Sequence, residues 1–219
     1  MKIGIFGDSF GEKSYVSETA TSKAWTTYIA EEFDIDNYCV SGSSFYYSAK
    51  LFLTNHHLYD KIIFLVTDPG RLEILPDFVI NSMQSRITDY TVASILAEET
   101  GNHIYKVAAD YFVYFNNYDK ECLFQYALLE KLKNAKSNDV LFLPCFKYSF
   151  DEQDRNDDEL FKISKLDEND TLLQVAGKRK EYRHCHFNSQ NNIIFAEKIK
   201  NWINTGFWKF ELNDFVHLT

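Results

Sequence analysis

The chain has 219 residues, which is enough for one domain with a substantial core or for two small domains. Hydrophobic residues make up 45% of it and charged residues 25%, the composition of an ordinary soluble globular protein. The formal net charge is −9 and no stretch is rich in Lys and Arg. This argues against nucleic acid as the main partner, because such binding depends on the neutralisation of phosphates.

The sequence has neither a membrane-spanning pattern nor a secretion signal. No apolar run approaches the length of a membrane span, and the N-terminus has no apolar signal region or cleavage site. The widely spaced cysteines are more typical of free core thiols than of a disulfide framework. We therefore expect a cytoplasmic protein without a membrane partner. The cysteines are Cys39, Cys122, Cys145 and Cys185.

The first strand and the turn that ends it contain the first candidate nucleophile. Residues 3–6 form an apolar run typical of a buried parallel strand, and Gly7-Asp8-Ser9 follows directly. Ligands of open α/β sheets bind outside the carboxyl ends of the strands, so the Ser9 hydroxyl is placed for chemistry. Gly, Asp and Ser are also ordinary turn residues, and a partner histidine is needed before the tripeptide indicates catalysis.

Strands and helices then alternate. The spacing of apolar residues predicts a helix over 23–33, capped by Ser22, and a short strand over 37–40. A second helix is predicted over 44–53, and residues 61–68 form the clearest central strand. This alternation is typical of right-handed βαβ units with a parallel sheet. No repeat or low-complexity linker divides the chain, so we predict one domain over residues 1–219.

The middle of the chain does not continue this alternation of strands and helices. Residues 85–135 have a helical pattern, interrupted near Gly101, and we predict that they form a helical insertion. Aromatic residues are concentrated over 105–126. We favour core packing for them over a ligand groove. An exposed part of these helices would provide a face for a homo-oligomer.

The last third contains a strand, a charged loop and a helix. Residues 139–146 form the fourth predicted strand. Residues 151–183 are charged and predict a loop insertion over the strand ends. The final helix is predicted over 189–204, with Gly206 just past its end.

Two histidines immediately before the final helix are candidate partners for Ser9. A serine hydroxyl is a poor nucleophile at neutral pH and needs an adjacent base, for which imidazole is the usual group. His184 and His186 both lie at the mouth of the predicted helix. With Cys185 between them they also suggest zinc, but one short segment rarely supplies a whole site. The sequence contains no second cluster of such ligands, so we predict no metal.

These motifs together resemble the SGNH hydrolases, also called the GDSL esterase/lipase family. Gly7-Asp8-Ser9 is similar to the first block, which supplies the nucleophile, and Gly42 to the second, whose backbone N–H helps to form the oxyanion hole. Val66-Thr67-Asp68 stands where the third block has Gly-x-Asn. His186, which precedes the closing helix, resembles the histidine of the fifth block. The four blocks occur in the family's order over essentially the whole chain.

The resemblance implies both a fold and an activity. The fold would be a three-layer α/β/α sandwich with a mostly parallel, flavodoxin-like sheet of about five strands. Ser9 would be the nucleophile and His186 the base, with the N–H groups of Ser9 and Gly42 in the oxyanion hole. The substrate would be a small ester or an acylated carbohydrate, and no metal or organic cofactor is implied.

Two positions depart from the family pattern. Thr67 or Asp68 stands where the family has the asparagine that donates to the oxyanion. Of these two, the Thr hydroxyl could donate a hydrogen bond, whereas an ionised Asp only accepts. Arg183 stands where the family has the Asp that orients the histidine, although Glu181 lies three residues before His184 and offers a shifted pair.

Asp8 and Arg71 complete the set of candidates, and both are predicted to contact the substrate. Arg71 follows the third strand, where it either binds an anionic group of a substrate or pairs with a carboxylate. The two departures also motivate a competing function, that of a catalytically degenerate binding or assembly protein with the aromatic middle region as its contact surface. Transfer of the acyl group to an acceptor other than water is a third option.

Overall fold

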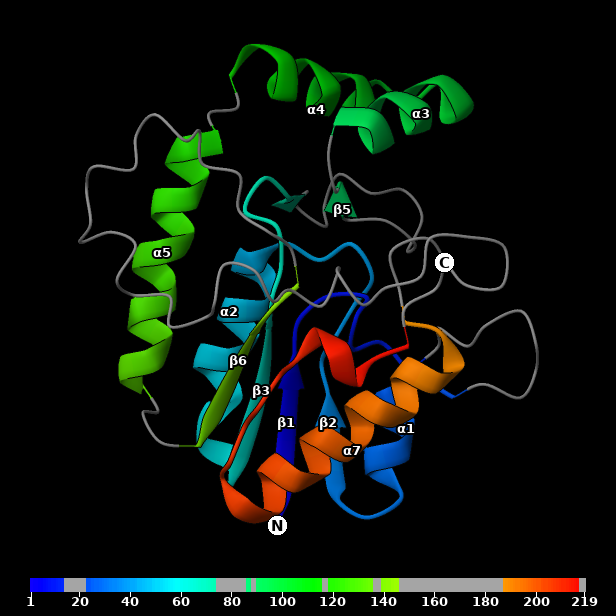
Figure 1. Ribbon diagram of the computed structural model, residues 1–219. Helices are drawn as coiled ribbons and strands as arrows, with labels where there is room; N and C mark the ends of the chain where they lie inside the picture. The colour runs from blue at the N-terminus through cyan, green and yellow to red at the C-terminus, as the bar shows by residue number, and fades with distance from the viewer. Residues whose placement is uncertain are drawn as a thin grey trace.

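A four-stranded parallel sheet lies at the centre of the structure (Figure 1), a computed structural model that describes residues 1–13, 23–73, 86–87, 90–115, 118–135, 139–145 and 187–216. The strand order is β2-β1-β3-β6, and all neighbours are parallel. This is the predicted flavodoxin-like order. Within the described residues this sheet has four strands, where about five were predicted. They are β1 (Lys2–Phe6), β2 (Asp34–Asn37), β3 (Lys61–Val66) and β6 (Val140–Pro144).

The central strands β1 and β3 are buried on both faces. All but the first residue of each is buried, which explains their continuous apolar sequences. Because side chains alternate along a strand, Ile5 and Ile63 contribute to one face and Phe6 and Phe64 to the other. Burying each such side chain contributes about 1.5–3 kcal/mol, so both faces need a helical cover.

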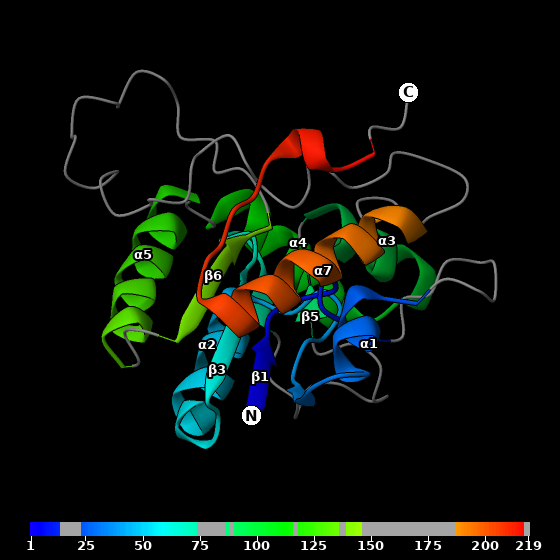
Figure 2. The same cartoon turned by 60° about the horizontal axis from the view of Figure 1, so that its bottom comes forward.

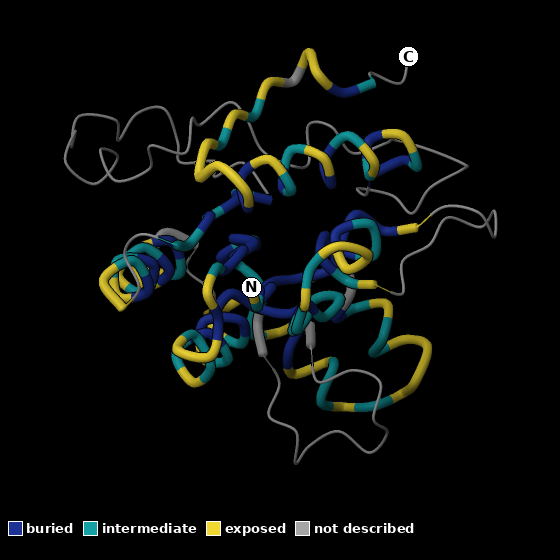
Figure 3. The backbone as a smooth tube through the Cα atoms, turned by 90° about the horizontal axis from the view of Figure 1, so that it is seen from below, coloured by how far each residue is buried: buried dark blue, intermediate teal, exposed yellow. Residues whose placement is uncertain are grey.

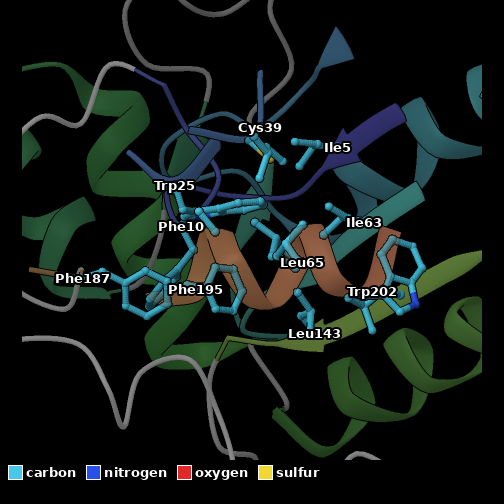
Figure 4. Packing of buried hydrophobic residues seen from close by; sticks show 14 of the residues in the cluster. Ile5, Phe10, Trp25, Cys39, Ile63, Leu65, Leu143, Phe187, Phe195 and Trp202 are labelled. Carbon is cyan, nitrogen blue, oxygen red and sulfur yellow. The ribbon is translucent and has the colours of Figure 1, made fainter. Parts of the chain in front are cut away.

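Helices α1 (Trp25–Ala30) and α7 (Ser189–Thr205) cover the first face. Trp25 packs edge-on against Phe195 with ring centroids 5.0 Å apart, and Trp202 extends the same cluster. Figure 4 shows these side chains between α7 and the sheet. The Trp25 backbone N–H also donates to Asn192 Oδ1 at 2.9 Å, which ties the start of α1 to α7. The two helices therefore form one layer although they lie at opposite ends of the sequence.

Helices α2 (Phe45–Asn55) and α5 (Tyr118–Ala135) cover the second face. Phe52 of α2 packs edge-on against Phe64 of β3, with ring centroids 5.7 Å apart. Leu132 of α5 is fully buried in the same cluster. The two faces give a helix–sheet–helix sandwich, which is clear when Figure 1 is compared with Figure 2. This confirms the predicted three-layer fold class.

The helix ends follow the local sequence. Ser44 accepts a hydrogen bond from Tyr47 N and caps α2, and Asn188 does the same for Asn191 N at the start of α7. Both helices match their predicted ranges to within about two residues. The predicted helix at 23–33 is shorter at both ends: it spans Trp25–Ala30, and Ala24 before it provides no side-chain cap. Ser22, its predicted cap, lies outside the described residues.

β2 lies three residues earlier than predicted, over Asp34–Asn37 instead of 37–40. It is an edge strand with no buried residue, and two of its four residues are aspartates. Polar side chains are compatible with an edge strand because only one of its sides pairs. The apolar run that suggested a strand instead continues into the turn beyond β2.

The predicted helical insertion at 85–135 is three helices: α3 (Tyr90–Thr100), α4 (His103–Tyr114) and α5. The break falls at Gly101, as predicted, and α3 and α4 lie beyond the carboxyl ends of the strands (Figure 1). A short antiparallel ladder of β4 (Leu72–Glu73) and β5 (Arg86–Ile87) precedes them. The aromatic stripe is only partly buried, since Tyr114 and Phe115 are each 74% exposed. Figure 3 shows the exposed stretches of the chain in yellow.

The C-terminal tail closes the first core cluster. A 3-10 helix, η5 (Leu212–Asp214), follows α7, and the segment 207–210 is not a strand. The rings of Phe210 and Phe215 lie 5.1 Å apart, and Phe215 is buried in the cluster. A second 3-10 helix, η1 (His56–Leu58), precedes β3. None of the described helices has both the length and the hydropathy that a membrane crossing requires.

Candidate active site at the carboxyl ends of the strands

The segment Gly7–Gly11 leaves β1 at its carboxyl end and carries Ser9, which is 5% exposed. Gly7 has a φ of +150°, and a Cβ at this position would lie 2.4 Å from Leu65 Cβ. Only glycine allows the chain to turn here while it passes this close to β3. The turn predicted from Gly7-Asp8-Ser9 is therefore present, and glycine is required at its start.

The backbone of this turn is fixed at every carbonyl from residue 7 to residue 11. The donors come from the turn itself, from β2 and the segment that follows it, and from α1, so three parts of the chain hold it. Such over-determination keeps one backbone conformation in place. The bonds are Val40 N and Ser43 Oγ to Gly7 O (3.2 and 2.9 Å), Gly11 N to Asp8 O (3.1 Å), Glu12 N to Ser9 O (3.4 Å), Trp25 Nε1 to Phe10 O (2.6 Å) and Asn37 Nδ2 to Gly11 O (2.7 Å).

Asp8 is fully buried and accepts hydrogen bonds at both carboxylate oxygens. Oδ2 accepts from Thr67 Oγ1 at 2.7 Å and from Arg71 Nη1 at 2.8 Å. Oδ1 accepts from Phe10 N at 3.1 Å, and Cys145 Sγ lies 3.8 Å from it. A buried carboxylate is stable when it is paired and hydrogen-bonded in this way. Asp8 thus connects the carboxyl ends of β1, β3 and β6.

The two residues predicted at the third block have different partners. The Thr67 hydroxyl donates to Asp8, and the Thr67 carbonyl accepts from Gln125 Nε2 of α5 at 3.0 Å. Asp68 Oδ1 accepts from Gly70 N at 2.7 Å in the turn that follows β3. The structure therefore brings Thr67 to the Ser9 turn by way of Asp8. Participation of Thr67 or Asp68 in an oxyanion hole stays a prediction.

Gly42 lies in the turn that follows β2 and has a φ of +70°, a conformation that favours glycine. Its neighbour Ser43 is fully buried and bonds to the Gly7 carbonyl, which fixes this turn beside the turn that carries Ser9. The first two sequence blocks are thus adjacent in space. The role of the Gly42 N–H as an oxyanion donor stays a prediction.

The candidate bases Glu181, His184 and His186 lie outside the described residues. The description resumes at Phe187, which is 7% exposed and packs edge-on against Phe10 with ring centroids 5.7 Å apart (Figure 4). Phe187 directly follows His186 in sequence, and Phe10 directly follows Ser9. Ser9 and His186 lie about 177 positions apart in the sequence, and the residues that directly follow them are in contact.

Two buried thiols lie beside the turn. Burial raises the pKa of the Cys39 thiol and of the Cys145 thiol well above the usual value, and the charge of Asp8 adds to both effects. Protonated thiols are weak nucleophiles, so neither cysteine is a better candidate nucleophile than Ser9. Cys39, Cys122 and Cys145 are buried thiols outside any disulfide, as predicted, and Cys185 lies outside the described residues. Within the described ranges, no group of three or more His, Cys, Asp or Glu is arranged to hold a metal.

Three residues that contact the site were not predicted from the sequence. Ser43 bonds to Gly7, Gln125 bonds to Thr67, and Cys145 lies against Asp8. Gln125 is a polar residue that is only 3% exposed, and it lies in a helix whose aromatic residues predict packing. A buried amide needs a polar partner, but the burial of Gln125 is not marked by any pattern in the sequence.

Comparison with known proteins gives likeness only at the level of solved structures. No family model and no curated protein sequence matches the chain. One similar structure is the acetyl xylan esterase AlAXEase, 15% identical, with 94% of this chain and 100% of that chain covered and a TM-score of 0.35. Another is a catalytic mutant of Axe2, an acetylxylan esterase from Geobacillus stearothermophilus, 10% identical, with 96% and 97% covered and a TM-score of 0.38. At these scores the likeness carries no argument about chemistry.

Proposed function

We propose that the protein is a serine esterase of the SGNH type that hydrolyses a small ester, such as an O-acyl group on a carbohydrate. Ser9 attacks the acyl carbon as its proton passes to His186, and the tetrahedral oxyanion accepts hydrogen bonds from the N–H groups of Ser9 and Gly42. His186 then donates the proton to the leaving alcohol. Water attacks the acyl-enzyme with the same histidine as base, which releases the acid and restores Ser9. His184 with Glu181 is the alternative base.

The contact between Phe10 and Phe187 is the observation that carries this proposal. It brings the sequence neighbour of the proposed nucleophile against the sequence neighbour of the proposed base. A serine and a histidine act together only when the fold makes them neighbours, because hydrogen-bond distance is required for proton transfer. The turn that carries Ser9 and the turn that carries Gly42 are adjacent, which adds support because the N–H groups of Ser9 and Gly42 are the proposed oxyanion donors.

Ester turnover by Ser9→Ala tests the proposal. Loss of the nucleophile is expected to lower kcat by about a millionfold, to background, while the fold is kept. Ser48→Ala is the matched control, because Ser48 is as buried as Ser9, at 1% exposed, and its hydroxyl donates to the carbonyl of Ser44 at the N-cap of α2. His186→Gln is expected to reduce kcat as strongly as Ser9→Ala, and His184→Gln weakly. Turnover by Ser9→Ala equal to that of Ser48→Ala would refute the mechanism.

A binding protein without catalysis is the second candidate, and the low exposure of Ser9 favours it. Only 5% of Ser9 is accessible, and the Thr67 hydroxyl is engaged by Asp8. A binding protein would bind an acylated sugar in calorimetry without hydrolysing any ester, and Ser9→Ala would bind with unchanged affinity. Turnover that depends on Ser9 excludes this candidate. Faster product formation with added alcohols or sugars would instead indicate acyl transfer.

A further inference from the structure

The ion pair between Arg71 and Asp8 is the most buried one in the described part of the chain. The Arg71 side chain is 11% exposed and that of Asp8 0%, whereas every other pair has at least one side chain that is 38% exposed or more. Buried pairs of this kind are weak contributors to net stability but impose a geometry, because an unpaired partner is strongly disfavoured. The pair therefore restricts the segments that it connects.

We propose that Arg71 is a positioning residue, which acts through Asp8 to orient the turn that carries Ser9. Arg71 and Thr67 both donate to Oδ2 of Asp8, so the carboxylate is oriented from the β3 side. Its other oxygen, Oδ1, accepts the N–H of Phe10, the residue directly after Ser9. The orientation set by Arg71 thus reaches the peptide unit next to the nucleophile. The kinetic part of this inference rests on the proposed function.

The geometry favours this role over binding of an anionic substrate by Arg71. Arg71 Nη1 already donates to Asp8 at 2.8 Å, and only 11% of the Arg71 side chain is exposed, so little of the guanidinium is accessible to an anionic substrate. A shift of Asp8 away from Arg71 would in turn disturb the hydrogen bond that Asp8 Oδ1 accepts from Phe10 N. The two roles differ in their kinetic signature, because positioning changes kcat, whereas substrate binding changes KM.

Amide hydrogen exchange tests positioning without any need for catalysis. The amides of Phe10, Gly11 and Glu12 donate to Asp8 or Ser9 within the turn. Arg71→Met is expected to accelerate exchange in the peptide that spans residues 7–12 by about tenfold or more. The matched control is Lys200→Met, because the Lys200 side chain is similarly buried, at 15% exposed, and it pairs with Glu32 after α1 and with Glu197 of α7, not with Asp8. Equal exchange in the two variants would overturn the proposal.

Kinetics with a neutral and an anionic ester separate positioning from substrate contact. Arg71→Met is expected to lower kcat about a hundredfold for both esters with KM within about twofold, since a small misplacement of a reacting group has this effect. In an Asp8→Asn background it should cause no further loss, because its action passes through Asp8. A KM increase confined to the anionic ester would overturn positioning in favour of binding.

The two readouts also separate this inference from the proposed function. If the wild-type protein shows no turnover that depends on Ser9, the proposed function fails, and the exchange measurement alone decides the role of Arg71. If Arg71→Met does not fold, Arg71→Lys replaces it, because lysine keeps the charge and loses the planar fork of donors. Faster exchange over residues 7–12 in Arg71→Lys than in Lys200→Met supports positioning, and equal exchange refutes it.

Discussion

A cluster near each end of β1 contains an aspartate, Asp36 of β2 in one and Asp8 in the other, that accepts hydrogen bonds from a basic side chain and a hydroxyl. At the amino end, Asp36 accepts from Lys2 Nζ at 2.8 Å and from the Tyr59 hydroxyl at 3.0 Å. The Lys2 and Asp36 side chains are each 41% exposed. At the carboxyl end, Asp8 has the corresponding partners, Arg71 and Thr67, and no exposed surface.

The two clusters contain similar groups, but the loss of one partner has different effects in them. Water solvates the amino-end pair, so breaking it leaves both charges hydrated. At the carboxyl end, removal of one partner leaves a charge without water or a counter-ion. Similar groups therefore form a solvated surface ion pair at the amino end of β1 and fix a backbone turn at its carboxyl end. The carboxyl end is also where ligands of such sheets bind, so the geometry there matters for chemistry.

The largest expected difference is in stability after loss of the basic partner. Arg71→Met leaves Asp8 buried without its counter-charge and is expected to lower the free energy of unfolding by about 3–5 kcal/mol. Lys2→Met is expected to produce no measurable shift, because its partner stays in water. Urea denaturation of both variants measures this. Equal losses in the two variants would show that burial does not distinguish the clusters.

Loss of the hydroxyl at the carboxyl end is expected to have a smaller effect. Thr67→Val keeps the shape of the side chain but removes a donor to Asp8 Oδ2, which we expect to lower stability by about 1–3 kcal/mol. Thr67→Ser keeps the hydroxyl and is the control. Stability should be retained in Thr67→Ser and lost in Thr67→Val in urea denaturation. A loss of similar size in both would show that the hydroxyl does not account for the effect, because Thr67→Ser keeps it.

The amino-end cluster is expected to affect the pH dependence of stability, most clearly at alkaline pH. Burial raises the pKa of Tyr59 well above its usual value, and its hydrogen bonds with Tyr38 and Asp36 act in the same direction. The folded protein then keeps the phenolic proton that the unfolded chain releases above about pH 10, so stability falls as the pH rises through that range. The slope from this group is at most about 1.4 kcal/mol per pH unit.

Urea midpoints between pH 9 and 11 measure this contribution. Tyr59→Phe is expected to flatten the alkaline decline, whereas Tyr114→Phe, at a side chain that is 74% exposed, should leave it unchanged. An unchanged decline in Tyr59→Phe would contradict the assignment. Asp36 acts at the other extreme, because the hydrogen bond from Lys2 lowers its pKa and its contribution is lost as the pH falls below the usual aspartate range.

Much of the fold could be predicted because local and global signals agree. The apolar runs of β1 and β3 read as buried strands because they are buried on both faces. The turn at Gly7 was predictable because small residues follow such a run directly. β2 was misplaced because an edge strand with one paired side has no apolar pattern to distinguish it. The exposure of Tyr114 was hidden because aromatic residues usually indicate packing.

The contacts within the site were predictable only in part. Ser9, Gly42 and Thr67 follow successive parallel strands, so their approach to one edge of the sheet follows from the topology. The bond of Gln125 to Thr67 depends on how α5 packs over the sheet, and no local pattern encodes it. For Arg71 the sequence left two alternatives open, a pair with a carboxylate and binding of an anionic substrate, because both need only a guanidinium at that strand end. The structure shows the pair, with Asp8.

The most direct test of the central claim, that Ser9 is an activated nucleophile in a fixed turn, is to map a fluorophosphonate adduct on the intact chain by peptide mass spectrometry. The account predicts one adduct, on the peptide that contains Ser9, formed within minutes and prevented by an ester substrate. Ser9→Ala should then remain unmodified. An unmodified wild-type Ser9, or an adduct at another serine that persists in Ser9→Ala, would contradict the claim.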